Sequence, residues 1–193
     1  MSLKSLLRLP LFVLALTFFA GAAHASFLIE PHLGYNISGS GERGSGASLS
    51  KYSYSGLQIG ARAGYQVLGF MAGLDFTRSS YTFETKGVAS TVNNDIDKNE
   101  VGIFVGYNLP ILLRAWATYY FSNTAKYSSS TTETSGNTTE LGVGFTGLPF
   151  MSINLMLRLV NFDEQKTSST TVAISPAIDL TEIVIGVSLP LTL

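Results

Sequence analysis

The amino-acid sequence predicts an all-β protein: an eight-stranded antiparallel up-and-down transmembrane β-barrel with short periplasmic turns and four long extracellular loops. Three observations predict it. From Phe27 onward apolar residues recur at every second position, the period of a strand whose two faces meet different surroundings. The connections between these segments are alternately short and long. The apolar face carries no charge, whereas the opposite face carries one charged residue on every strand.

The first 25 residues are typical of a secretory signal peptide. Two basic residues precede the apolar run Leu9–Phe19, and small residues follow it up to Ala23-His24-Ala25. A basic start, a short apolar run and an A-x-A end define such a signal. The run is shorter than the roughly 20 residues that a membrane-spanning helix needs. We therefore expect residues 1–25 to be cleaved and residues 26–193 to form the barrel domain.

Composition excludes several classes of protein. Only 13% of residues are charged, although 46% are hydrophobic, and soluble domains usually carry about 25% charge. Removing the signal peptide takes two of the 12 basic residues and none of the 13 acidic ones, so the mature net charge is −3. That value does not favour a nucleic-acid partner. Without cysteine, disulfides and a lipid-anchored N-terminus are excluded.

Eight segments show the strand alternation. They are expected at about 27–37, 53–66, 70–79, 100–109, 112–122, 139–147, 151–162 and 182–193. In the first, Phe27, Ile29, Leu33, Tyr35 and Ile37 share one face. In the last, the alternation runs from Ile183 to Leu193. No helical segment is expected after the signal peptide.

The connections define the two ends of the barrel. Short turns are expected at Val67-Leu68-Gly69, Pro110-Ile111 and Leu148-Pro149-Phe150. Long connections rich in Ser, Thr, Gly and Asn are expected at about 38–52, 79–99, 123–138 and 163–181. Even-numbered strands with short turns on one side and long loops on the other are the layout of outer-membrane barrels. Both termini then lie on the periplasmic side, and the Ser/Thr runs at 128–135 and 167–171 form either polar loops or strands that protrude above the membrane.

A soluble eight-stranded barrel such as a lipocalin is the main alternative, since it has the same alternation. A ligand-binding soluble barrel, however, has an apolar interior and a charged exterior. Here the charge lies on the glycine-rich face instead. That face carries Glu30, Arg62, Asp75, Glu100, Arg114, Glu140, Arg158 and Glu182, which we expect to form an interior charge network.

Aromatic residues support the membrane interpretation, because outer-membrane barrels have an aromatic girdle at each interface. Five aromatic residues lie beside the short turns: Phe27, Tyr65, Phe70, Tyr107 and Phe150. Five others lie toward the long loops: Tyr54, Phe76, Tyr81, Tyr119 and Phe121. These two sets are expected to form the two girdles.

In this pattern and topology the whole mature chain resembles the small outer-membrane barrels of the OmpA/OmpX type. The resemblance implies residence in the bacterial outer membrane. The partners it implies are outer-membrane lipid, lipopolysaccharide and the barrel-assembly machinery, with an extracellular partner reached through the loops. We expect a monomer. Pro31 and Pro190 fall on the first and last strands, and each removes a ladder donor, so a locally weak seam is expected where the barrel closes.

The interior of an eight-stranded barrel is just wide enough for side chains to fill it. Counted from the short turns, Glu140 lies nearly opposite Arg158, and Arg62 lies within a diagonal step of Asp75. Cross-strand neighbours of this kind approach to about 5–8 Å. We therefore expect a packed, ion-paired plug. The alternative is that the same charges line a narrow channel or a lateral portal for small or apolar molecules.

Catalysis is not expected, although a lipid-modifying enzyme is a third candidate class. The mature chain has one histidine, His32, with Glu30 as a possible partner, and a base without a placed nucleophile is not a site. The stretch 93–100 resembles the start of a calcium loop but lacks the glycine at its sixth position and the distant Glu. No catalytic residue, cofactor or metal is predicted, and a structural, surface or adhesion role through the loops is favoured.

Overall fold

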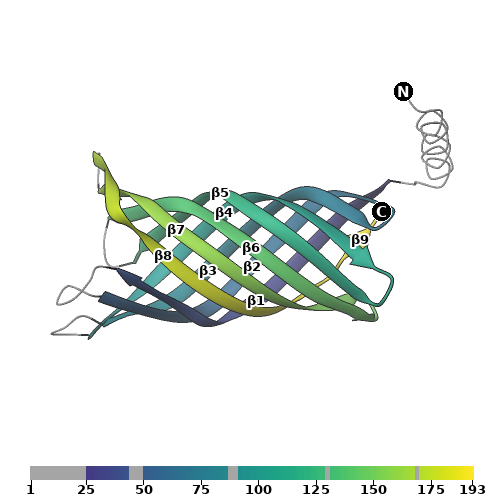
Figure 1. Cartoon of the computed structure of the whole chain (residues 1–193), viewed down its shortest axis with the longest axis horizontal. Coiled ribbons are helices and arrows are strands. Elements are labelled where there is room, and N and C mark those ends of the chain that lie inside the picture. The colour runs from purple at the N-terminus through teal and green to yellow at the C-terminus, as the bar shows by residue number, and fades with distance from the viewer. Residues whose placement is uncertain (1–24, 44–49, 87–90, 129–130, 168–169) are drawn as a thin grey trace, which may run out of the picture.

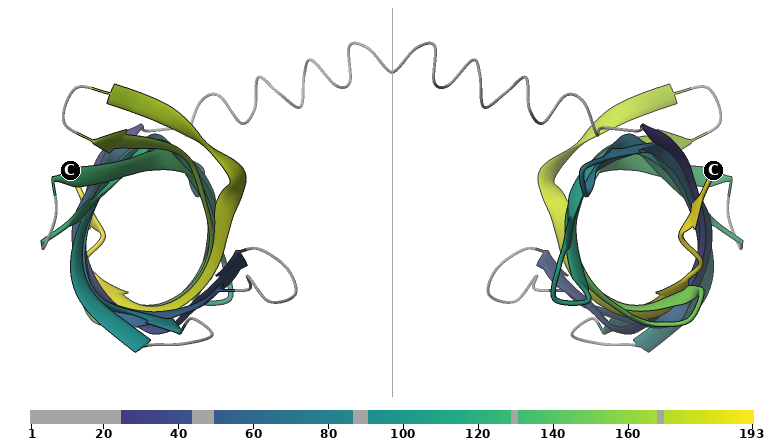
Figure 2. Two further views of the ribbon diagram at one scale, coloured as in Figure 1. Left: turned by 90° about the vertical axis from the view of Figure 1, so that its left-hand side faces the viewer. Right: turned by 90° about the vertical axis from the view of Figure 1, so that its right-hand side faces the viewer.

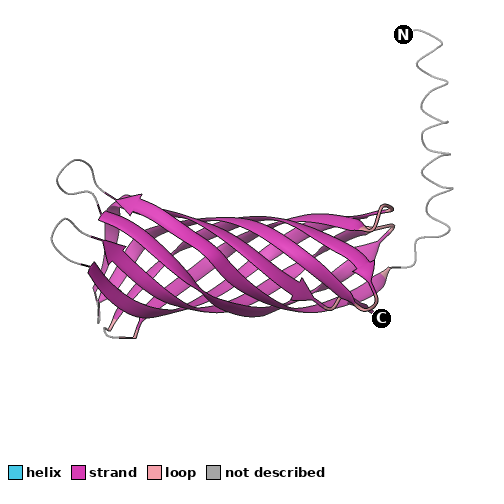
Figure 3. Ribbon diagram, turned by 90° about the horizontal axis from the view of Figure 1, so that it is seen from below, coloured by secondary structure: helices cyan, strands magenta, loops and turns pink. Residues whose placement is uncertain are grey.

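The computed structural model describes residues 25–43, 50–86, 91–128, 131–167 and 170–193. Figure 3 shows these residues as strands joined by short turns. No helix in the described ranges is long and apolar enough to cross a membrane. The signal peptide predicted at 1–25 lies outside the described residues, apart from Ala25, so its cleavage stays a prediction.

Eight long antiparallel strands close into one ring. They are β1 (Ser26–Arg43), β2 (Ser50–Val67), β3 (Phe70–Lys86), β4 (Thr91–Leu109), β5 (Leu113–Tyr127), β6 (Thr132–Leu148), β7 (Met151–Thr167) and β8 (Thr170–Ser188), followed by the short β9 (Leu191–Thr192). Each strand pairs with its neighbours in the sequence, and β1 pairs with both β2 and β8. Figures 1 and 2 show the resulting tilted barrel from the side and along its length. The predicted fold class is confirmed.

Side chains alternate between the lumen and the outer surface, as the sequence predicts. In β7, Ile153, Leu155 and Leu157 are 42–49% exposed. Met156 and Arg158, which lie between and beside them, are 3% and 0% exposed. Because the period of a strand is two, the apolar set of every strand faces outward together and the polar set fills the lumen.

Three short turns define one end of the barrel, called here the turn end. Leu68 and Gly69 join β2 to β3 with φ angles of 51° and 85°, and two consecutive positive φ angles match the twist of a tight hairpin. The start of β1 and the end of the chain lie at the same end. Phe27 and Leu193 exchange two backbone hydrogen bonds of 3.0 and 2.9 Å, so the last residue is tied to the beginning of β1.

At the seam, where β1 pairs with β8 and then with β9, the strand pairing is interrupted near the two prolines. The register is the same on both sides of this interruption. Leu28 pairs with Thr192 on β9, and four residues further His32 pairs with Ser188 on β8. Pro190, which has no N–H to donate, lies in the gap between these ladders. Pro31 still accepts a hydrogen bond of 3.0 Å from the Leu189 N–H. The seam therefore lacks a donor at this point without any slip of the strands.

The opposite end, called here the loop end, differs from the prediction. Most of the predicted long loops are strand: β1 continues to Arg43, and β4 begins at Thr91. The Ser/Thr-rich segments 132–135 and 170–171 also belong to strands, so they are not loops. The segment 93–100 is likewise part of β4 and is not a calcium loop. Thr and Ser tolerate extended backbone, which allows the strands to extend past their apolar section.

One of the two predicted aromatic girdles is also partly wrong. All five aromatic residues assigned to the turn end are exposed on the outer surface, from Tyr107 at 37% to Phe150 at 86%. At the loop end, Phe76, Tyr119 and Phe121 face outward as well. Tyr54 and Tyr81, in contrast, are only 5% and 4% exposed and lie inside the barrel.

Candidate functional site

All eight residues of the predicted interior charge network face the lumen, and none is more than 2% exposed. Each strand contributes one of them because they occupy the inward positions of the alternation. Burying an isolated charge is costly, so buried charges are paired and hydrogen-bonded. Their contacts therefore decide whether the lumen is a packed interior or a polar path.

The charges nearest the turn end are grouped around Arg114 and Arg62. Arg114 donates to both carboxylate oxygens of Glu30, one of them at 2.8 Å. Arg62 donates to Asp75 at 2.7 Å. Glu30 also lies 3.6 Å from Arg62. This arrangement makes a chain of four alternating charges from strands β5, β1, β2 and β3.

Glu140 connects this group to a second one nearer the loop end. Its Oε1 accepts hydrogen bonds from Arg62 Nη2 at 3.0 Å and from the Trp116 indole at 2.9 Å. Its Oε2 lies 3.2 Å from Arg158 Nε. One carboxylate is thus held between two buried guanidinium groups.

The second group is centred on Arg158. This residue donates to Glu182 at 2.7 Å and to Glu100, and it contacts the side-chain oxygen of Gln58 at 3.2 Å. Lys98 donates to the same Glu182 at 2.7 Å and lies 3.5 Å from Glu100. All eight predicted residues therefore belong to one connected set of charge contacts.

Sequence reasoning missed Lys98, which is 2% exposed, because it falls within the predicted loop 79–99. A usable signal exists in the alternation itself. Lys98 has the same parity as Glu100 on β4, and Ile96 and Lys98 both point inward. In the predicted strand 100–109 the even-numbered residues face inward, and continuing that alternation toward the N-terminus would have placed Lys98 in the lumen. With Lys98 the described network has four cations for its five carboxylates, instead of three.

His32 lies at the edge of the network, with a different partner from the one expected. Its Nε2 is 3.3 Å from Asp75 Oδ1, whereas Glu30 is engaged by the two arginines. The Thr77 hydroxyl donates to the same Asp75 oxygen at 3.2 Å. His32 therefore contacts the network through one carboxylate, that of Asp75. Among the described residues no cluster of His, Cys, Asp and Glu is arranged to hold a metal ion.

Glycines on the lumen face make room for the large side chains. A Cβ added to Gly142 would lie 2.1 Å from the Trp116 ring, so the ring occupies the space that a side chain would need. The Trp116 ring in turn lies 4.5 Å from the Arg62 guanidinium, within the range of a cation–π contact. The network is therefore packed against rings as well as paired.

An apolar cluster lies inside the barrel between the charge network and the loop end. Its members are 2–7% exposed and come from six strands: Tyr54, Tyr81, Ile96, Ala125, Val160, Phe162 and Leu180. Lys98 Nζ lies 5.2 Å from the centre of the Tyr81 ring, so this cluster directly adjoins the charges. A smaller cluster of Leu28, Met71 and Phe104 lies toward the turn end. The charges thus have apolar packing on both sides.

The polarity of the wall reverses along the barrel. Around the charge network the outer surface is apolar, as at Ile103 and Leu157, which are 53% and 42% exposed. Around the loop-end cluster the outward positions are polar, and there Ser80 donates to Asp97 at 2.6 Å. Around the charge network the strands therefore have apolar outward side chains and charged inward ones. Nearer the loop end the same strands have polar outward side chains and apolar inward ones.

Comparison with known proteins identifies no family, since no family model and no curated protein matches the chain. Among solved structures, the Neisserial surface protein A is similar at 14% identity, covering 87% of this chain and 99% of its own, with a TM-score of 0.49. The outer membrane protein OprG from Pseudomonas aeruginosa is similar at 13% identity, covering 88% and 97%, also with a TM-score of 0.49. These are likenesses of fold at low identity.

Proposed function

We propose that this chain is a non-enzymatic integral protein of the bacterial outer membrane. Its barrel interior is a sealed, ion-paired plug, and its loop end serves a structural, surface or adhesion role. The burial of the eight network residues, each at most 2% exposed, carries this proposal. A water-filled pore would expose the charges that line it, as in the wide barrels of porins.

The outer surface supports the membrane placement. On β4 the outward apolar run extends from Val101 to Leu109. About nine residues at a rise of ~3.3 Å, tilted by about 40°, span roughly 20–25 Å, close to the apolar band of outer-membrane barrels. Above that band the wall becomes polar outside and apolar inside, as expected where strands leave lipid and enter water.

The packing also argues against the narrow channel. A path along the lumen would have to cross the loop-end cluster, where Tyr81 and Phe162 are 4% and 7% exposed. Apolar constrictions of this kind exclude water and ions. The charges beneath are held by several partners each, and moving one aside would leave others buried without a counter-charge, which is costly.

The test is solute release from lipid vesicles that contain the full mature barrel. Wild-type protein should release neither small sugars nor ions faster than empty vesicles. A variant combining Tyr81→Ala with Phe162→Ala should also release neither, because it opens the loop-end cluster while the charge network beneath it stays paired. Rapid release by the wild-type protein would overturn the sealed-interior proposal.

A further inference from the structure

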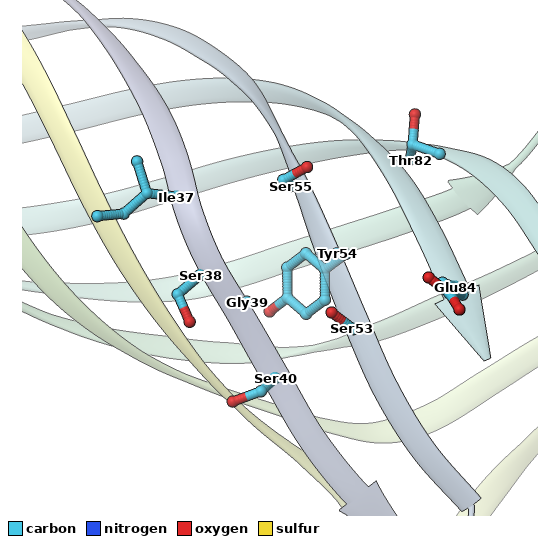
Figure 4. A pocket seen from close by; sticks show the side chains of 9 residues that line it. All are labelled: Ile37, Ser38, Gly39, Ser40, Ser53, Tyr54, Ser55, Thr82 and Glu84. Carbon is cyan, nitrogen blue, oxygen red and sulfur yellow. The ribbon is translucent and has the colours of Figure 1, made fainter. Parts of the chain in front are cut away.

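A groove on the outer wall marks the level at which the barrel surface changes from apolar to polar. It has a volume of about 390 Å³ and lies across β1, β2 and β3 (Figure 4). Six of its residues bear hydroxyl groups, Ser38, Ser40, Ser53, Tyr54, Ser55 and Thr82, and Glu84 bears a carboxylate. The Tyr54 hydroxyl is already engaged, because it donates to Glu182 inside the barrel. Volumes of about 300–1,000 Å³ are typical of sites for small molecules.

A β-bulge in β1 shapes the groove. The register of β1 shifts after Asn36 against both neighbouring strands, β2 and β8. As a result two consecutive residues, Ile37 and Ser38, both face outward, and Ile37 is 52% exposed. Bulges re-aim side chains in this way and are often found next to functional sites.

The groove continues directly into the apolar belt. On the strands that form it, Tyr35, Ile37, Leu57 and Ile59 are 46–62% exposed and face outward toward the turn end. An occupant of the groove would therefore have lipid chains beside it on one side and water on the other. An amphipathic molecule, with its head in the groove and its chains on the belt, matches this division.

The lining chemistry indicates which kind of head group fits. The four serine hydroxyls make no hydrogen bond with other described residues, and a hydroxyl both donates and accepts. Among the described residues that line the groove none is basic and one is acidic, which disfavours an anionic phosphate. A sugar offers several hydroxyls that can each donate to and accept from the serine hydroxyls.

We propose that this groove binds the sugar head group of a membrane glycolipid whose acyl chains lie against the belt at Tyr35, Ile37, Leu57 and Ile59. The inference rests on the membrane placement proposed above. It adds a lipid site on the outer wall, separate from the sealed lumen.

The experiment is native mass spectrometry of the mature barrel in detergent, titrated with a diglucosyl diacylglycerol or with phosphatidylethanolamine of the same chains. The glycolipid should bind more tightly. Ser53→Val combined with Ser55→Val should weaken its binding about tenfold, as expected for two lost hydrogen bonds. Thr139→Val, an exposed hydroxyl replacement across the barrel on β6, should leave binding unchanged. Unaltered heat-resistant migration in gels would show that each variant folds.

Three outcomes would overturn the proposal. Equal retention of both lipids would mean a non-selective lipid shell. Preference for phosphatidylethanolamine, lost in Glu84→Gln, would mean an ammonium site instead. Retention of neither lipid by protein that inserts into vesicles would mean that the groove binds no lipid. Failure to insert would contradict the membrane placement itself, so the two proposals can fail separately.

Discussion

Glu140 and Arg158 lie directly opposite each other on β6 and β7, and Arg158 Nε is 3.2 Å from Glu140 Oε2. The contact is a charge pair without an aligned hydrogen bond, because the Nε–H has no acceptor in line. Both residues have further partners: Glu140 accepts from Arg62, and Arg158 donates to Glu100 and Glu182. The pair is thus the junction between the two halves of the network.

Breaking this junction should destabilise the barrel strongly. Glu140→Gln leaves two buried arginines short of a counter-charge, and such losses cost about 3–5 kcal/mol. Combining it with Arg158→Met should give a coupling energy of about 1–3 kcal/mol in a double-mutant cycle. Urea unfolding in lipid vesicles measures both values. Strict additivity of the two changes would contradict the pairing.

Exchanging the two charges should not restore stability. In an isolated pair, Glu140→Arg with Arg158→Glu would recover most of the loss. Here the new glutamate would face Glu100 and Glu182, and the new arginine would face Arg62. Like charges at short range in a buried site are costly. Full recovery in the same unfolding assay would show that the pair acts alone.

Lys98 should matter far more than an exposed lysine in a similar pair. Lys98→Met removes a buried partner of Glu182 and should cost about 3 kcal/mol. Lys126 lies 3.2 Å from Glu133, but its side chain is 62% exposed, so Lys126→Met should cost less than about 1 kcal/mol. Both lysines are paired with a glutamate, so the difference between the two losses in free energy of unfolding reports the effect of burial. Equal costs would mean that Lys98 is not held as described.

The glycine beneath the indole offers a packing test with its own spectroscopic signal. Gly142→Ala should displace the Trp116 ring and cost about 1–3 kcal/mol. Trp116 is the chain's single tryptophan, so its fluorescence reports the displacement. Gly147→Ala is the control, because the atoms nearest to its Cβ would be those at the outer end of the Phe145 ring, a side chain that is 43% exposed on the outer surface. An unshifted emission spectrum in Gly142→Ala would contradict the packing.

The outer belt predicts depth-dependent effects of charge. Leu155→Arg places a cation in the middle of the apolar run on β7 and should cost about 2–4 kcal/mol in lipid. Thr171→Arg, on the exposed part of β8 near the loop end, should cost less than about 1 kcal/mol. Folding free energies in vesicles provide the comparison. Similar costs at both positions would place the bilayer elsewhere.

Much of this structure could be predicted from alternation alone, because lipid and a narrow lumen impose opposite demands on the two faces of every strand. That rule located all eight strands and all eight charges, Glu30 and Glu182 included. It failed where the surroundings change. At Tyr54, Tyr81 and Lys98 the strands have left the apolar belt, so outward apolar residues no longer mark the strand. The inward parity continues there, but its chemistry reverses. Tyr81 and Lys98 therefore fall in the segment 79–99, which the sequence predicts as a loop. Tyr54, at the start of the predicted strand 53–66, is assigned to the outer girdle instead of the lumen.

Partners within the lumen were only partly predictable. Neighbours on adjacent strands, such as Arg62 and Asp75, follow from register. Contacts across the lumen, such as Arg114 with Glu30 or Arg62 with Glu140, depend on strand tilt and on which side chains the glycines leave room for. His32 shows the consequence, since its partner is Asp75 on another strand and not the nearby Glu30.

Single-channel conductance of the refolded wild-type protein in a planar bilayer tests the sealed lumen most directly. We expect no discrete openings from protein that is inserted and resists unfolding until heated. Steady openings whose size changes when Arg62 or Arg114 is neutralised would contradict this account, because the current would then pass through the residues described here as a closed plug.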